Sequence, residues 1–157
     1  MSVEKYWKAL AAGDGKTMAL CYAPDATFCD PVFDLKGAEV GAMWRMLMQG
    51  ATDLEVSTGP LRWNEGDGDA TGTLEARYTF SLTGRRVTNR IHSTFWVRDG
   101  LIVRQVDRFP FWRWARQALG WKGVVLGWTP VVRKAVRKQA RARLDAFMAR
   151  GATTPSA

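Results

Sequence analysis

Few side chains in this sequence are suited to acid–base chemistry near neutral pH. Histidine is the residue most often used for it, and the chain of 157 residues has one histidine, His92. The two cysteines, Cys21 and Cys29, are too few and too close together for a disulfide scaffold. No group of residues has metal-ligand spacing, so we expect no metal site. Carboxyl and phenol groups remain as the candidate acids and bases.

Two neighbouring strands are predicted over residues 86–98 and 101–109, and the alternation of side chains along them indicates which polar residues share a face. Successive side chains of a strand point to opposite sides, so Gln105 and Asp107 share one face of the last strand. Ser93 and Phe95 share a face of the strand before it. His92 has the opposite parity, which places it on the outer face. We therefore predict a surface or dimer-interface role for His92.

Hydrophobic spacing predicts the elements that position these residues. Apolar residues recur at helical spacing in the N-terminal third, where Ser2 and Asp14 are candidate helix caps. Further along, β-branched and aromatic segments are separated by glycine-bearing turns, which is typical of an antiparallel meander. The predicted helices are 2–13, 14–24 and 38–48, and the predicted strands are 26–30, 54–63, 70–82, 86–98 and 101–109. Helices followed by a meander indicate an α+β fold.

Composition limits the class of protein. Hydrophobic residues make up 46% and charged residues 24% of the chain, as in ordinary globular proteins. No apolar run approaches the roughly 20 residues of a membrane span, and the N-terminus lacks the pattern of a secretory signal. We predict a cytoplasmic protein. Its expected organisation is a domain over residues 1–109, a helical extension over 110–150 and a flexible tail over 151–157.

Short motifs recur in the first two thirds of the chain. Those of the N-terminal third are Tyr6, Ala9-Leu10, Ala12-Gly13-Asp14, Asp25-Ala26-Thr27 and Asp30-Pro31-Val32, and those further on are 78–80, Thr83-Gly84-Arg85, Phe95 and Asp99-Gly100-Leu101-Ile102. Together they resemble the ketosteroid isomerase and SnoaL-like superfamily, which has the nuclear transport factor two-like fold. The resemblance covers residues 5–109. It implies a cone in which helices pack into a curved antiparallel sheet around an internal pocket, and it implies a homodimer.

The resemblance also implies roles for two residues. In the isomerases, the residue that matches Asp30 is the general base, and the residue that matches Tyr6 hydrogen-bonds the oxygen that becomes an enolate. An apolar cavity disfavours the charged carboxylate and so makes it a stronger base, and a phenol can donate to an oxyanion; ketosteroid isomerase is itself a well-known case of such tuning. Two plainer interpretations remain open. Asp30 before proline could simply end a strand, and Tyr6 could be ordinary core.

One departure from the isomerase pattern changes the expected site. The isomerases have a protonated aspartic acid as second oxyanion donor, and Ser93 stands at that position here. Asp107 lies on the last strand, where SnoaL-like enzymes often carry an acid or base, although it could instead pair with Arg90 or Arg104. We therefore predict Asp30, Asp107 and Tyr6 as catalytic residues. The predicted substrate-binding residues are Trp44, Tyr78, Phe80, Ser93, Phe95 and Gln105.

The excess positive charge lies in the C-terminal part. Residues 1–108 hold 13 basic and 14 acidic residues, whereas residues 109–157 hold 10 basic and 1 acidic. The segment from Pro130 onward is a basic amphipathic helix, preceded by four of the eight tryptophans. The aromatic residues could close the mouth of the cone while the helix packs on the protein's own surface. Alternatively, the aromatic residues and the basic helix could bind an anionic membrane surface, as in a peripheral protein. Nucleic-acid binding is less favoured, because no reader motif accompanies the charge.

These observations lead to one functional hypothesis and two alternatives. The leading hypothesis is a cofactor-free isomerase or cyclase of the SnoaL-like type, which uses carboxyl groups as acid and base on a hydrophobic small molecule. The first alternative is a non-catalytic protein that binds a lipid-like ligand, favoured by the serine at position 93. The second is an epoxide hydrolase.

Overall fold

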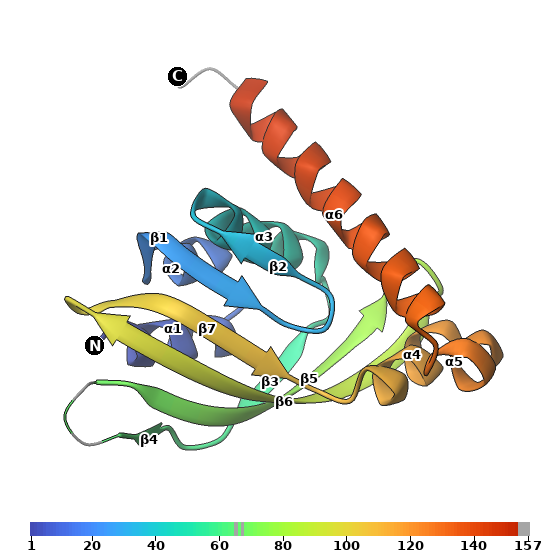
Figure 1. Ribbon diagram of the computed structural model, residues 1–157, viewed down its shortest axis with the longest axis horizontal. Helices are drawn as coiled ribbons and strands as arrows, with labels where there is room; N and C mark the ends of the chain where they lie inside the picture. Colours follow the sequence, from blue (N-terminus) through green and yellow to red (C-terminus); the bar gives the residue numbers. More distant parts are fainter. Residues whose placement is uncertain (65, 67, 154–157) are drawn as a thin grey trace.

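The computed structural model describes residues 1–64, 66 and 68–153 and has the α+β architecture that the sequence predicts (Figure 1). Its helices are α1 (Ser2–Ala11), α2 (Gly15–Ala19), α3 (Ala38–Gly50), α4 (Phe111–Leu119), α5 (Trp121–Leu126) and α6 (Pro130–Thr153). Its strands are β1 (Tyr22–Cys29), β2 (Asp34–Lys36), β3 (Glu55–Thr58), β4 (Arg62–Trp63), β5 (Ala70–Phe80), β6 (Arg85–Arg98) and β7 (Leu101–Arg108).

The strands form one curved sheet in the order β2-β1-β7-β6-β5-β3, and β4 pairs with β5. The predicted meander is confirmed, because β3, β5, β6 and β7 pair antiparallel in sequence order. At the β6–β7 hairpin, Asp99 and Gly100 both have positive φ, 53° and 77°, as an Asp-Gly hairpin turn requires. The sequence pattern did not reveal the pairing of β1 with β7, which is parallel.

Several predicted boundaries were wrong. Ser2 is the first residue of α1 rather than its cap, which is Met1, and the Ser2 hydroxyl donates instead to the Gly100 carbonyl. The second helix ends at Ala19, because Tyr22 already belongs to β1. The predicted strand 54–63 is divided into β3 and β4 around Pro60, which has no amide hydrogen to donate to a sheet.

Two further predictions fall partly outside the described residues. The turn predicted between 64 and 69 includes residues 65 and 67, and the predicted flexible tail, 151–157, includes residues 154–157. Its described part, 151–153, is helical and completes α6.

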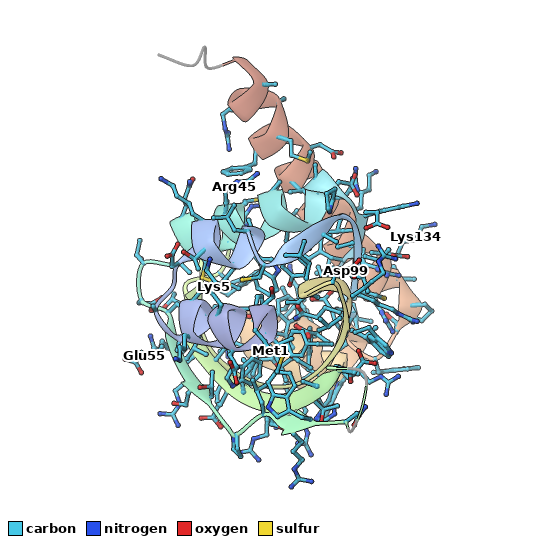
Figure 2. The ribbon with its side chains drawn as sticks, turned by 90° about the vertical axis from the view of Figure 1, so that its left-hand side faces the viewer. Met1, Lys5, Arg45, Glu55, Asp99 and Lys134 are labelled. Atoms are coloured by element: carbon cyan, nitrogen blue, oxygen red, sulfur yellow. The ribbon has the colours of Figure 1, made fainter. Side chains whose placement is uncertain are left out.

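The core lies between the concave side of the sheet and the helices α1 and α3. Figure 2 looks along the molecule from the end that carries Met1 and Asp99 and shows the sheet curving around α1. Tyr6 and Trp7 of α1 pack edge-on against Phe95 of β6, with ring centroids 5.4 Å and 5.9 Å away. Burial of such aromatic rings contributes strongly to the stability of a small domain.

The C-terminal extension packs against the opposite end of the cone (Figure 1). Trp114, Ala115 and Ala118 of α4 form a buried cluster with Val87 of β6. α6 passes beside α3, and its Leu144 is fully buried in the main core. None of the helices in the described ranges is long and apolar enough to cross a membrane.

Candidate functional site

A cavity of about 530 Å³ lies between the sheet, α3 and the C-terminal extension. Its walls come from the ends of β5, β6 and β7, from the second half of α3, and from α4 and α6. Most of the lining is aliphatic or aromatic. Five of the residues predicted for the site line this cavity, namely Asp30, Trp44, Tyr78, Phe80 and Asp107.

Asp30 follows β1 directly, at the turn that leads to β2. Its Oδ1 accepts hydrogen bonds from the backbone amides of Val32 and Phe33, both at 2.6 Å. Asp30 therefore ends the strand, as the plainer interpretation held, and its carboxyl group also lines the cavity. Burial raises the pKa of Asp30 to about 6, although the hydrogen bonds from the two backbone amides lower it. Such a group is a stronger base than an exposed aspartate, yet it is largely ionised at neutral pH.

Asp107 lies on β7 and is 5% exposed. Burial is again the main cause and raises the pKa of Asp107 to about 7, helped by the negative charge of Asp30. Gln105 opposes this rise, because its Nε2 donates to Asp107 Oδ1 at 2.9 Å. The carboxyl group is therefore still substantially protonated near neutral pH, when Asp30 is mostly ionised. Two coupled carboxyl groups with separated titrations can act as base and acid.

The arginines that were alternative partners of Asp107 are engaged elsewhere. Arg90 forms an ion pair with Glu75 at 3.3 Å, and the guanidinium of Arg104 lies 4.7 Å from the centre of the Trp96 ring. Arg133 and Arg137 of α6 act on Asp30 through space and lower its pKa, but less than burial raises it.

A buried hydrogen-bond network stands behind Asp107. Trp44 Nε1 donates to the Tyr22 hydroxyl at 2.9 Å, and that hydroxyl donates to Gln105 Oε1. Gln105 Nε2 then donates to Asp107 and, at 3.2 Å, to the Tyr6 hydroxyl. Gln105 is fully buried, so its amide fixes the orientation of the Asp107 carboxyl group. This arrangement supports Asp107 from within the core.

The structure places three other predicted residues in the wall behind the cavity rather than on its surface. Tyr6 is fully buried, and its hydroxyl faces Gln105. Phe95 packs against Tyr6 in the core. Ser93 lies opposite Asp107 in the β6–β7 register, close enough to lower the pKa of that carboxyl. Its Oγ is nevertheless the one buried side-chain polar atom in the described part of the chain without a hydrogen bond of normal geometry.

Tyr78, predicted as a substrate-binding residue, adds a polar group to the cavity. Trp114 Nε1 donates to its hydroxyl at 2.8 Å, which leaves the phenol hydrogen free to donate. Burial raises the pKa of Tyr78, and the negative charge of Asp30 raises it further. Tyr78 therefore stays neutral at physiological pH and lies within electrostatic reach of Asp30.

Two residues of this site were not predicted from the sequence. Tyr22 was assigned to a helix, although its place on a strand beside β7 gives it access to Gln105. Trp114 belongs to the C-terminal extension, and closing the mouth of the cone was one of the alternatives for its aromatic residues. α4 and α6 do line the cavity, through Trp114 and Ala140 among others. The only sequence signal for this role was the density of aromatic residues in the extension.

The remaining candidates lie away from the cavity. His92 is exposed on the outer side of β6, as predicted, and its Nδ1 is 3.5 Å from Thr73 Oγ1. No group of three or more histidine, cysteine or carboxylate side chains that could hold a metal ion occurs within residues 1–64, 66 and 68–153.

Comparison with known proteins identifies the kind of domain that carries this cavity. The SnoaL-like domain matches residues 3–105, well over half of the chain. No curated protein matches the sequence.

Solved structures of the same fold include proteins with different activities. The LEH-like epoxide hydrolase of M. tuberculosis is 23% identical, with a TM-score of 0.59 over 79% of this chain and 90% of that chain. A protein with a ketosteroid isomerase-like fold from Catenulispora acidiphila, solved with trimethylamine, is 16% identical, with a TM-score of 0.64 over 82% and 97%. SalBIII, an epoxide hydrolase/cyclase-like enzyme of pyran ring formation in the polyether salinomycin, is 19% identical, with a TM-score of 0.59 over 69% and 88%. At these identities the likeness establishes the fold.

Proposed function

This chain belongs to the SnoaL-like domain family, and from that premise we propose that it is an isomerase- or cyclase-type enzyme that uses Asp30 and Asp107 as base and acid. The observation that carries the proposal is the presence of two carboxyl groups on one apolar cavity, Asp107 buried and Asp30 partly buried, with pKa values raised to about 7 and about 6. Burial disfavours the charged form of both groups and so raises both pKa values. Near neutral pH, Asp30 is then an ionised base of increased strength, and Asp107 still carries a proton.

In the proposed reaction, ionised Asp30 removes a proton from the carbon beside a substrate carbonyl. The C–H electron pair becomes the C=C bond of an enol, and protonated Asp107 gives its proton to the carbonyl oxygen. If a double bond conjugated with the enol extends it to a dienol, return of the Asp30 proton to the far carbon, as Asp107 takes back the enol hydrogen, completes an isomerisation. Alternatively, the enol carbon attacks a second carbonyl and closes a ring by a C–C bond; the oxygen of that carbonyl takes the Asp30 proton, and Asp107 takes back the enol hydrogen. The two carboxyl groups exchange their protonation states during the first step and are restored in the second.

The amides and side chains around the two carboxyl groups fit these roles. The Val32 and Phe33 amides bind one oxygen of Asp30, which orients the group and leaves Oδ2 for the substrate. Gln105 holds Oδ1 of Asp107 in the same way. Tyr78 is a further donor to the developing enolate oxygen, because its hydroxyl accepts from Trp114 and retains its own hydrogen. Tyr6 acts in this scheme through Gln105, as a positioning residue.

The cavity indicates the class of substrate. Its volume, about 530 Å³, is in the usual range for small-molecule sites. The walls are mainly apolar, with Trp44, Phe80 and Leu47 among them, and the polar groups lie together at Asp30, Asp107 and Tyr78. We expect a hydrophobic molecule that carries one or two carbonyl groups.

The test does not require the natural substrate. Hydrophobic ketones and diketones, including steroid enones and polyketide-like diketones, would be incubated with the protein in D₂O, and deuterium at the carbon beside the carbonyl would be measured by NMR. We expect catalysed exchange for at least one ketone class, loss of that exchange in Asp30→Asn, and retention in Asp34→Asn. Asp34 is a matched control because it is an exposed aspartate on the neighbouring strand β2. Tight binding of a ketone without any catalysed exchange would contradict the proposal and favour the binding-protein alternative.

Epoxide hydrolysis is a second candidate, since a like fold occurs in the epoxide hydrolase of M. tuberculosis. The same carboxyl pair would serve it: Asp30 would take a proton from water as the water oxygen attacks the epoxide carbon, and Asp107 would protonate the epoxide oxygen as its C–O bond breaks. A parallel incubation with terpenoid epoxides in ¹⁸O-labelled water distinguishes the two reactions. Labelled diol without ketone exchange would support hydrolysis, and the absence of diol supports the proton-transfer enzyme.

A further inference from the structure

Large apolar side chains are exposed together around α5, outside the cavity. We call this surface the α5 patch and define it by its apolar residues. Trp121 is 72% exposed and Trp128 73% exposed, and Val131, at the start of α6, is 74% exposed. Such a grouping is unusual on a protein that functions alone, because scattered apolar residues are normal on surfaces but contiguous patches mark contact sites. The members of the patch are Trp121, Val124, Val125, Leu126, Trp128 and Val131.

The packing of α5 explains why these side chains point outward. α5 contacts α4 through Gly123 and Gly127, which approach Ala115 closely. A Cβ atom at Gly123 would lie 2.0 Å from the Ala115 carbonyl oxygen, and one at Gly127 would lie 2.8 Å from Ala115 Cβ. Only glycine fits against α4 at this distance. The sequence therefore places its smallest residues on the inner side of α5 and its largest apolar residues on the outer side.

The segment that carries the α5 patch is positively charged. Residues 111–134 contain five lysine or arginine residues and no aspartate or glutamate. Two of these cations lie over exposed indole rings: Lys122 Nζ is 6.0 Å from the centre of the Trp121 ring, and the Arg116 guanidinium is 5.0 Å from that of Trp112. Lys134, near the patch in sequence, extends away from the body of the protein (Figure 2).

We propose that the α5 patch docks onto the surface of an anionic phospholipid bilayer. Indole rings favour the interface between headgroups and acyl chains, where one edge is apolar and the other is wet. Lysine and arginine beside them are attracted to anionic lipid headgroups. A second copy of the chain fits less well, because two such patches facing each other would bring like charges together.

Within the C-terminal extension, the α5 patch is better suited to a membrane contact than the basic helix α6. The membrane alternative drawn from the sequence relied on the basic helix together with the aromatic residues before it. The apolar side of that helix is not free for such a contact, because Leu144, Ala140 and Phe147 pack against the protein's own core. Beyond Val131 at its start, the described part of α6 exposes polar and small side chains and no large apolar one. The exposed apolar surface belongs to α5 and to the residues that follow it.

The α5 patch also lies beside the cavity. Leu119, two residues before Trp121, lines the cavity. The neighbouring β5–β6 turn is tied to the end of α4, because the Thr83 hydroxyl donates to the Ala118 carbonyl. Leu82 in that turn is 53% exposed and also lines the cavity. Docking of the patch would therefore bring a wall of the cavity close to the lipid surface, whatever reaction the cavity carries out.

The experiment is sedimentation of the full chain with large vesicles of phosphatidylcholine alone or of phosphatidylcholine with phosphatidylglycerol, at low and high salt. The test variant is Trp121→Ser with Trp128→Ser. The control is Trp63→Ser, which removes an exposed indole from β4 at the far end of the sheet (Figure 1). Thermal unfolding of each variant checks that it is folded, and Lys122→Glu tests the charge without removal of an indole.

We expect binding to the anionic vesicles, weakened by salt, with affinity reduced more than tenfold in the double tryptophan variant and unchanged in Trp63→Ser. The basis is that each indole can bury on the order of 100 Å² in the interface. Lys122→Glu should weaken binding by roughly fivefold or more, the fold-change that corresponds to about 1 kcal/mol per cation near an anionic surface. No binding of the wild type at low salt would overturn the proposal. Equal binding by the double variant would overturn it too, as would a concentration-dependent dimer that the double variant cannot form.

Discussion

Replacement of Asp107 by asparagine is expected to stabilise the protein, and to do so only above the acidic range. Asparagine has nearly the same size as aspartate and carries no charge at any pH. In the wild type, burial raises the folded-state pKa of Asp107 from 3.8 to about 7. Below pH 3.8 the carboxyl group is protonated in both the folded and the unfolded chain, so the two proteins should then be similarly stable.

The sign and size of this change in stability follow from the linkage between proton binding and folding. Between the two pKa values the unfolded chain has lost the proton and the folded chain keeps it, so the free energy of unfolding of the wild type falls as pH rises, and the loss is complete above about 7. At about 1.4 kcal/mol for each unit of pKa difference, the full loss is on the order of 4 kcal/mol. Since Asp30 and Asp107 titrate together, we expect a gain of roughly 2–4 kcal/mol for Asp107→Asn at pH 8.

Urea denaturation of the wild type and Asp107→Asn at pH 5 and pH 8 measures this difference. Asp34→Asn is the control, because the carboxyl group of Asp34 is exposed. An Asp107→Asn variant that is no more stable than the wild type at pH 8, or that is more stable by the same amount at both pH values, would contradict the raised pKa of Asp107. A gain in stability with a loss of activity is common where a charged group is held in an apolar site.

Three further predictions concern the cavity. The rate of deuterium exchange into a bound ketone should follow a bell-shaped pH profile with limbs near pH 6 and pH 7, falling roughly twentyfold at about two pH units on either side of the maximum; a profile that is flat from pH 5 to 8 would disagree. Gln105→Met should destabilise the fold by about 2–4 kcal/mol in urea denaturation, because it leaves buried hydroxyls without partners. It should also move the alkaline limb of the rate profile to higher pH, because the hydrogen bond from Gln105 lowers the pKa of Asp107. An alkaline limb that does not move would count against a positioning role for Gln105. Tyr78→Phe should reduce kcat about 10²-fold with little change in KM if the phenol binds the enolate oxygen, and a change confined to KM would make Tyr78 a binding residue only.

The fold was largely predictable because its signals are local. Strand alternation and the Asp99-Gly100 turn identified the β6–β7 hairpin, and the N-terminal motifs indicated the superfamily. The same alternation placed Asp107 and Gln105 on one face, and the structure links them by a hydrogen bond. Where the residues of one strand determine which side chains face inward, sequence reasoning is effective.

What could not be predicted depends on contacts between distant segments. β1 pairs parallel with β7 through residues about 80 positions apart, so Tyr22 looked like the end of a helix. The burial of Tyr6 behind the cavity could not be predicted either. Only the packing of α1 shows that Gln105 lies between the Tyr6 hydroxyl and Asp107. Helical spacing specifies which face of a helix is buried, but not which residues of the cavity lie beyond it.

The role of the C-terminal basic helix could not be predicted either, because it too depends on contacts with distant segments. A helical stripe opposite a basic face is typical both of a membrane helix and of a helix packed on its own protein. Leu144 of α6 is fully buried, which the pattern alone did not determine. Conversely, the glycines at 123 and 127 gave no sign in the sequence of how closely α5 approaches α4.

The central claim is that Asp30 and Asp107 hold one proton between them near neutral pH, and ¹³C NMR titration of the aspartate carboxyl groups tests it most directly. Asp30→Asn and Asp107→Asn assign the two resonances. We predict apparent pKa values near 6 and 7 in the wild type, with the pKa of Asp107 lower in Asp30→Asn, because the repelling charge is gone. Two carboxyl groups that both titrate below pH 5, or that titrate independently of each other, would contradict the account.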